Sequence, residues 1–250
     1  ERVARQQEPV IKAITYSDQQ SEPLEYQRIL QNYDEYSDEQ KKSYIAEHPL
    51  EYPAKLLELL DKNPELLDFV IHYPVRASLQ EEIDLTDELE SDSVPRLYQW
   101  DLRWGYEPYA GGMIGYTGCG PTCLSMVALH LTRNVEYSPA YVASVAEKEG
   151  YSIKGTGTSW ELMSKGCKLF GLRATELPLD ENRMMSELAN GRPIICAMGK
   201  GDFTENGHFI VIRGYLGGFL VNDPYSSERS DKVWSFDELR PQIRNLWAYR

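Results

Sequence analysis

Hydrophobic positions in the first ninety residues are interspersed with Glu, Gln and Tyr in a glycine-poor stretch, which is typical of helices. We predict helices over residues 24–45 and 51–73. Within the second range, the sequence Asn-Pro-Glu at residues 63–65 is a helix start signal, so we expect two short helices joined near Lys62. A polar lead-in, residues 1–22, precedes these helices.

Leucines recur through the predicted helices, at positions 56, 57, 59, 60, 66 and 67. They exceed what a lone helix can expose, because burying such a side chain is worth roughly 1.5–3 kcal/mol. We therefore expect the helices to dock on the rest of the chain or on a partner. Residues 81–94 are acidic, lack strong periodicity and predict a linker. The remainder is punctuated by glycines, so we predict a helical extension over residues 1–90 and a second domain over residues 91–250.

A second apolar pattern, at positions 124, 127, 128 and 131, has the spacing of a helix with one buried face. Pro121 is favoured in the first helical turn, because its missing N–H would have had no partner there. The predicted helix therefore starts beside Cys119, and its macrodipole directs partial positive charge at the sulfur. Gly118 and Gly120 flank this thiol, and we expect them to permit unusual φ values and close approach of a substrate backbone.

Residues 209–212 form a short apolar run between Gly207 and Gly214 and predict a buried strand with His208 at its end. The next apolar run, residues 218–221, follows a glycine-containing turn, so the two runs predict a hairpin. The second strand carries Asp223 back toward the histidine. Asp223 can then orient the imidazole, although the neighbouring Asn222 is an alternative partner.

A thiol, an imidazole and a carboxylate in the chain order Cys119, His208, Asp223 indicate a papain-type cysteine nucleophile. A free cysteine is mostly protonated at neutral pH, so a catalytic cysteine needs its thiolate stabilised by a helix N-terminus, by a cationic histidine, or by both. The side-chain amide of Gln99 can donate to a developing oxyanion, together with the backbone N–H of Cys119. By composition alone, Gln99 is an ordinary surface amide.

Four sequence blocks resemble the C39-like peptidases, a branch of the papain-like cysteine peptidases. They are Gln-Trp-Asp at 99–101, Gly-Cys-Gly-Pro-Thr at 118–122, Gly-His-Phe at 207–209 and Asn-Asp-Pro at 222–224. The resemblance covers residue 95 to the C-terminus. It implies a papain-like α+β fold, in which the nucleophile helix packs on an antiparallel sheet. It also implies Cys119 as nucleophile, His208 as general base and acid, Asp223 as its orienting partner and Gln99 as oxyanion donor.

The resemblance favours a free-standing bacterial member of the family acting on a peptide or protein substrate, and it leaves the cleavage specificity open. We expect Gly118, Gly120, Trp160 and Gly207 to contact that substrate, with the loops at residues 155–160 and 199–204 along the cleft rim. The other three cysteines are expected in the core; they are Cys123, Cys167 and Cys196. The cysteine spacing fits neither a redox pair nor a zinc knuckle, so we predict no metal or cofactor.

The net charge of −13 and the isoelectric point near 4.8 argue against nucleic-acid binding, which needs clustered Lys and Arg. No apolar run approaches the length of a membrane span. The sequence begins with Glu1 and lacks an initiator Met; with the family resemblance, this leads us to expect a secreted or cell-surface bacterial protein. The cysteines leave the redox compartment open, and the sequence leaves the oligomeric state open.

The predicted activity is therefore a cysteine-dependent hydrolase of peptide or isopeptide bonds. Two alternatives use the same fold. An acyl transferase would pass the acyl group from Cys119 to an amine. A non-catalytic module would bind peptides or surfaces and use the helical extension as its docking element.

Overall fold

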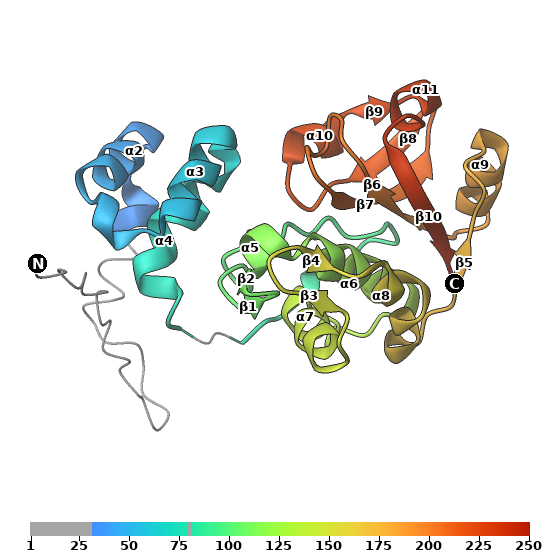
Figure 1. The fold of residues 1–250 in the computed structure, drawn as a ribbon, viewed down its shortest axis with the longest axis horizontal. Coiled ribbons are helices and arrows are strands. Elements are labelled where there is room, and N and C mark those ends of the chain that lie inside the picture. Colours follow the sequence, from blue (N-terminus) through green and yellow to red (C-terminus); the bar gives the residue numbers. More distant parts are fainter. Residues whose placement is uncertain (1–31, 80–81) are drawn as a thin grey trace, which may run out of the picture.

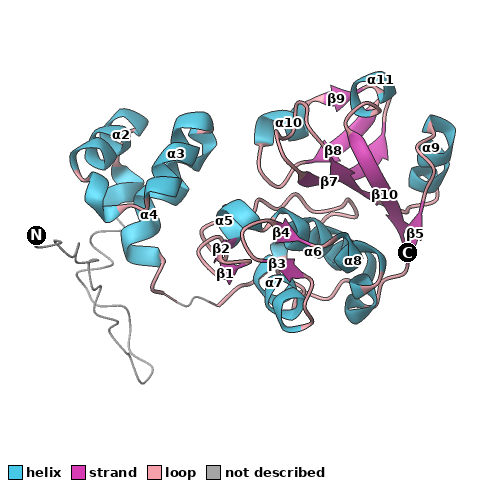
Figure 2. Ribbon diagram, in the orientation of Figure 1, coloured by secondary structure: helices cyan, strands magenta, loops and turns pink. Residues whose placement is uncertain are grey.

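A computed structural model describes residues 32–79 and 82–250. The polar lead-in at 1–22 and the first part of the helix expected over 24–45 lie outside the described residues. Figure 1 shows a group of helices beside a larger body that combines helices with a sheet. The large sheet and the longest helix lie in different parts of the larger body (Figure 2), so we call these parts the sheet lobe and the helix lobe. Its α+β composition agrees with the fold class predicted from the sequence.

In the N-terminal helical unit, residues 32–79, five helical segments follow the helical turn at 32–35. They are α2 (Asp38–Glu47), η1 (Pro49–Glu51), α3 (Ala54–Lys62), η2 (Pro64–Leu66) and α4 (Leu67–Arg76). The expected break near Lys62 is confirmed, because the Asn63 side chain accepts from the Glu65 N–H and starts a new helical segment at Pro64. The single helix expected over 24–45 is wrong in its described part. A helical turn at 32–35 ends before Ser37, which begins α2 with a capping box.

The helix lobe is built around α6, which begins at Cys119 and contains Pro121 in its first turn, as predicted. Shorter elements surround it. They are η3 (Asp87–Leu89), β1 (Pro108–Tyr109), β2 (Gly112–Met113), α5 (Ile114–Thr117), α7 (Pro139–Lys148), β3 (Ser152–Ile153), β4 (Gly157–Thr158), α8 (Trp160–Ser164) and η4 (Gly166–Phe170), and α6 itself spans Cys119–Thr132.

The sheet lobe contains a six-stranded antiparallel sheet in the order β5-β10-β6-β7-β8-β9. Its elements are β5 (Ala174–Glu176), α9 (Glu181–Ala189), β6 (Ile194–Met198), β7 (His208–Tyr215), β8 (Phe219–Asn222), α10 (Ser227–Asp231), β9 (Val233–Trp234), α11 (Phe236–Leu239) and β10 (Ile243–Tyr249). Strands β7 and β8 form the predicted hairpin around Gly217, whose φ of 68° suits a glycine. The hairpin brings the end of β8 back beside His208.

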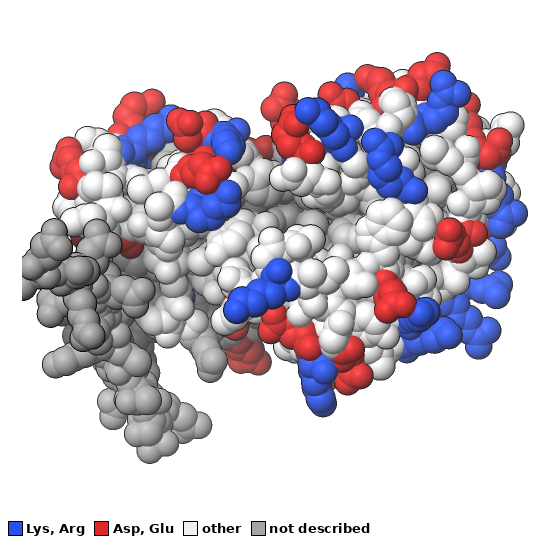
Figure 3. All heavy atoms as spheres, viewed as in Figure 1, with Lys and Arg blue, Asp and Glu red and all other residues white. Residues whose placement is uncertain are grey.

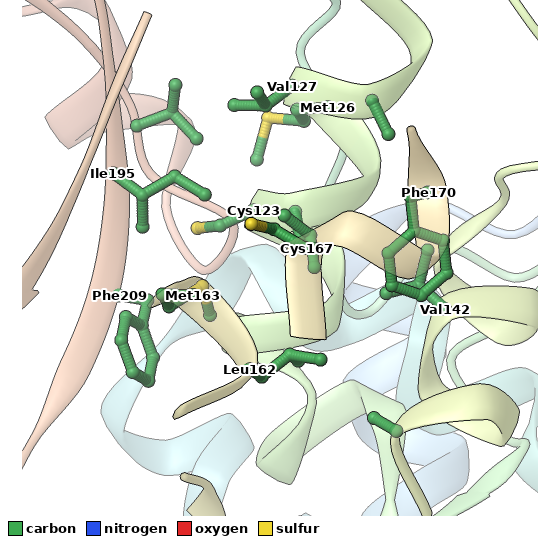
Figure 4. Close-up of a cluster of buried hydrophobic side chains, with 14 of the residues drawn as sticks. Cys123, Met126, Val127, Val142, Leu162, Met163, Cys167, Phe170, Ile195 and Phe209 are labelled. Carbon is green, nitrogen blue, oxygen red and sulfur yellow. The ribbon is translucent and has the colours of Figure 1, made fainter. Parts of the chain in front are cut away.

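The sheet separates two hydrophobic cores. Along β6, Ile195 and Ala197 face the helix lobe, whereas Ile194 and Cys196 face the opposite core under α9, as the two-residue period of a strand requires. The first core joins the sheet to α6, α7 and α8, and Figure 4 shows Cys123 and Cys167 packed within it. Burial raises the pKa of these two thiols and of Cys196. The prediction that these three cysteines are core residues is confirmed.

The N-terminal helical unit docks on the rest of the chain, as its leucines predict. Leu56, Leu66 and Leu67 are buried in a third cluster, which also contains aromatic residues of the helix lobe. The ring of Phe69 stacks on Tyr106 with ring centroids 4.5 Å apart, and the Tyr106 hydroxyl donates to the Phe69 carbonyl. The docked unit therefore lies directly beside α5 (Figure 1).

Positive and negative side chains are interspersed over the face in Figure 3, with uncharged stretches between them. Among the helices of the described residues, none combines the length and hydrophobicity needed to cross a bilayer.

Candidate active site

Cys119 is the first residue of α6 and is partly exposed, whereas the other three cysteines are buried. Its helix is fixed on the rest of the lobe because residues 120–129 are all buried. The backbone N–H groups in the first turn of α6 have no carbonyl within the helix to which they can donate. The thiol therefore lies where partial positive charge is available to a thiolate.

The two glycines beside Cys119 do not have the unusual φ values predicted for them. Gly118 has an ordinary φ of −96°, and Gly120 lies within α6, so neither supplies a left-handed backbone. A Cβ on Gly118 would overlap Ile114, and a Cβ on Gly120 would overlap Thr158. The absence of side chains lets α5 and β4 pack tightly against the start of α6, and the expected substrate contact of both glycines stays a prediction.

His208 and Asp223 form a buried hydrogen-bonded pair. The Nε2 atom of His208 lies 2.7 Å from Oδ1 of Asp223, and the two side chains are 9% and 0% exposed. Because Nε2 is occupied by this bond, Nδ1 is the ring nitrogen left for Cys119, whose thiol is close enough to the imidazole to help raise its pKa. Thiol, imidazole and carboxylate therefore lie together at one site, where the imidazole is bonded to the carboxylate.

The electrostatics of the pair favour its charged form. Burial acts to lower the pKa of His208, but the Asp223 carboxylate and, to a smaller extent, the nearby Cys119 outweigh it and raise this pKa to about 10. For Asp223, burial acts to raise the pKa, yet His208 and Arg229 bring it below its usual value. An imidazolium beside a carboxylate is thus stabilised over the neutral pH range.

Two residues hold the Asp223 carboxylate from its other side. Arg229 Nε donates to Oδ2 at 2.5 Å, and the Tyr225 N–H donates to Oδ1 at 2.8 Å. Sequence analysis missed Arg229. The only local sign was Ser226 three residues earlier, a cap that places Arg229 in the first helical turn after Asp223.

Asn222 points elsewhere, which decides between the two candidate orienting residues. Its side-chain amide donates to the carbonyls of Val94 and Pro95 at 3.2 and 3.0 Å, and its oxygen accepts from Arg213 Nε. These bonds attach the segment after the predicted linker to β8. Asp223 is therefore the partner of His208 in this structure.

Gln99 is 2% exposed, so it is not the surface amide that composition alone suggests. Its side-chain Nε2 donates to the Gly115 carbonyl at 3.0 Å, which uses one of the two amide hydrogens. Its backbone N–H donates to the Pro224 carbonyl at 2.8 Å. Gln99 thus links the segment after Asp223 to α5, the helix that precedes Cys119.

The other two residues expected at the substrate, Trp160 and Gly207, lie on the surface. Trp160 is 47% exposed and its ring lies edge-on to Trp247, with centroids 6.0 Å apart. A Cβ on Gly207 would meet no atom within 4 Å, so there is open space beside His208. Their contact with substrate stays a prediction, as does that of the loop at 155–160. The loop at 199–204 is tied to Gln242, which accepts from the Asp202 N–H.

Sequence analysis also gave no role to Tyr225. The rings of Tyr225 and His208 meet edge to face with centroids 6.5 Å apart. The Tyr225 carbonyl accepts from Trp100 Nε1 at 3.0 Å and from Asn63 Nδ2 at 3.1 Å. No periodicity or motif indicates these contacts, because they join three distant parts of the chain.

Comparison with curated proteins gives no match. Among solved structures, the chain is similar to the peptidase domain of Streptococcus ComA, a bi-functional ABC transporter involved in a quorum-sensing pathway. The similarity has a TM-score of 0.40 and 23% sequence identity, and it covers 54% of this chain and 90% of that domain. The model of the Peptidase_C39 like family matches residues 91–250. The chain therefore belongs to the C39-like peptidase family, with the papain-like α+β fold predicted from its sequence and additional N-terminal helices.

Proposed function

We propose that the protein is a cysteine peptidase whose catalytic residues are Cys119, His208 and Asp223. The observation that carries this proposal is the hydrogen bond between His208 and the buried Asp223 carboxylate, with the Cys119 thiol close enough to the imidazole to help raise its pKa. A nucleophile bonded to a base, which is itself oriented by a third group, is the arrangement that nucleophilic catalysis needs. Strongly perturbed pKa values, such as that of His208, also concentrate at functional sites.

In the first half-reaction, the thiolate of Cys119 attacks the carbonyl carbon of the scissile bond, and the carbonyl oxygen becomes an oxyanion. His208 then gives its proton to the leaving amine as the C–N bond breaks, which leaves a thioester on Cys119. In the second half-reaction, His208 removes a proton from water, which attacks the thioester. The carboxylic acid product departs and the thiolate is regenerated.

Asp223 keeps the imidazole in the orientation that both proton transfers require. It accepts from Nε2, so that Nδ1 remains directed to the thiol. Its own bonds to Arg229 and to the Tyr225 N–H hold the carboxylate in place. Asp223 stays ionised throughout and stabilises the imidazolium that forms when the thiol is deprotonated.

Gln99 is the proposed oxyanion donor, together with the backbone N–H of Cys119. One amide hydrogen of Gln99 is held by the Gly115 carbonyl, which fixes the plane of the amide and leaves the second hydrogen for a ligand. Loss of one such donor typically reduces transition-state stabilisation by about 2.7–4 kcal/mol. Family membership and partial exposure of Cys119 favour a peptide or protein substrate.

The test is a peptide-library cleavage screen with the wild type, a Cys119→Ala variant and a Cys196→Ala control. Cys196 is a buried thiol in β6 that does not belong to the proposed site. We expect cleavage by the wild type and the control and none by Cys119→Ala. If the Cys119→Ala variant processes the same peptides at the wild-type rate, the proposed mechanism is wrong.

A further inference from the structure

Glu65, in the N-terminal helical unit, uses both carboxylate oxygens to bind the segment that follows Asp223. Its Oε1 accepts from the Ser226 hydroxyl at 2.9 Å, and its Oε2 accepts from the Ser227 N–H at 2.7 Å. The two partners are more than 160 positions away in the sequence. Hydrogen bonds to a carboxylate are stronger than those between neutral groups. Glu65 therefore ties the N-terminal helical unit to the segment that follows Asp223.

The bound segment is the start of α10. Ser226 caps this helix by accepting from the Arg229 N–H, and its carbonyl accepts from the Ser230 hydroxyl. The first N–H groups of a helix have no partner within the helix, so they need acceptors from elsewhere. Glu65 supplies one of these acceptors to Ser227 and fixes the rotamer of the capping Ser226.

Helix α10 in turn holds Asp223. Arg229 donates to the Asp223 carboxylate at 2.5 Å, and the Ser230 hydroxyl accepts from the Asp223 N–H at 2.9 Å. Asp223 carries the bond to His208. A continuous series of hydrogen bonds therefore runs from the N-terminal helical unit to the imidazole.

A second contact from the same unit supports the loop between Asp223 and α10. Asn63, two residues before Glu65, donates to the Tyr225 carbonyl, and the Tyr225 ring lies edge-on to His208. The charged and titratable groups that face the imidazole are thus Asp223, Cys119 and Tyr225, with Arg229 behind the carboxylate.

We propose that Glu65 is a positioning residue for the active site, so that the N-terminal helical unit is required to hold Asp223 against His208. The effect of Glu65 on kcat rests on the proposed function. Glu65 touches neither the thiol nor the imidazole, so it acts through α10 alone. Removing it frees the start of α10, which lets Arg229 and Asp223 leave the geometry that orients the ring.

The experiment compares Glu65→Ala, Glu65→Gln and a Glu58→Gln control with the wild type. Glu58 lies on α3 of the same unit and, among the residues that the structure describes, forms ion pairs with two surface lysines, Lys55 and Lys62. Loss of a helix cap typically shifts a local equilibrium by about two- to thirtyfold. We expect Glu65→Ala to lower kcat by a factor in that range with KM unchanged. The effect of Glu65→Gln is smaller, because its amide oxygen still accepts from Ser227.

A second readout does not depend on peptidase activity. The Nε2 proton of His208, held by Asp223, gives a downfield NMR signal, which is assigned by its loss in a His208→Ala variant. We expect its exchange with water to accelerate in Glu65→Ala, less in Glu65→Gln and not in Glu58→Gln. Circular dichroism establishes that each variant is folded at the temperature used.

The two readouts separate this proposal from the proposed function. Faster exchange in Glu65→Ala supports the positioning role even if no peptide substrate is cleaved by the wild type, an outcome that would count against the peptidase alone. The positioning role is refuted if folded Glu65→Ala and Glu65→Gln exchange this proton at the same rate as Glu58→Gln. It is equally refuted if Glu65→Ala raises KM and leaves kcat unchanged.

Discussion

Phe69 is the side chain through which we expect the N-terminal helical unit and the helix lobe to stabilise one another. Its ring is 1% exposed and covers two glycines of the helix lobe, Gly105 and Gly115, where a Cβ would overlap the ring. The perturbation is Gly115→Ala, alone and together with Phe69→Ala. The control is Gly214→Ala, whose Cβ would make an ordinary contact of 3.7 Å with Leu220.

The magnitudes follow from how tightly this contact is packed. Overpacking by a methyl group costs about 1–3 kcal/mol, so we expect Gly115→Ala to lower the free energy of unfolding by that amount. Phe69→Ala leaves a cavity and should lower it by about 3–5 kcal/mol. In the double variant, the new methyl group enters space that the ring has vacated. Its loss of stability should therefore be smaller than the two single losses added, by about 0.5–3 kcal/mol.

The assay is urea unfolding followed by far-UV circular dichroism, which reports on the helices of both parts. For a chain of this size, the expected loss in Gly115→Ala corresponds to a fall in Tm of about 2–12 °C. Gly214→Ala should change stability little. The reasoning is refuted if Gly115→Ala is as stable as the wild type, or if the two single effects add to within about 0.5 kcal/mol.

Three further predictions concern the candidate site. Asp223→Asn should lower kcat by about two to four orders of magnitude, because Asp223 orients the His208 ring. Asn222→Ala should keep most of the activity and lower the free energy of unfolding by about 1–3 kcal/mol, because the Asn222 side chain bonds to backbone carbonyls and not to the ring. Steady-state kinetics and urea midpoints separate the two effects. Folding raises the pKa of His208 from its ordinary value of 6.5 to about 10, so protonation of this residue stabilises the fold. This stabilisation is fully present below pH 6.5 and disappears as the pH rises through about 10. The stability difference between wild type and His208→Gln should therefore shrink over that range; a constant difference would contradict the assignment. Cys119 should be the first cysteine alkylated by iodoacetamide, and His208→Ala should slow its alkylation at neutral pH. If mass spectrometry gives the same alkylation rate for Cys119 in the wild type and in His208→Ala, this would argue against the pairing of Cys119 with His208.

Several features of the site follow from short stretches of sequence. The start of α6 beside Cys119 follows from Pro121 and the apolar pattern after it, and the position of His208 at a strand end follows from the apolar run 209–212. These features depend on helix and strand periods and on backbone geometry within a few residues. Local pattern therefore identified the thiol, the imidazole and the hairpin that returns to it.

The sequence by itself pointed to Cys119, His208 and Asp223 as candidate catalytic groups and predicted the helix and the hairpin beside which they lie. Only the tertiary structure decided between Asn222 and Asp223, because adjacent residues of a strand point to opposite sides, and the side that meets His208 depends on how the hairpin packs. It likewise decided that Gly118 serves packing against Ile114. The contact of Glu65 with the start of α10 joins residues more than 160 positions apart, and no period or motif encodes a pairing at that separation.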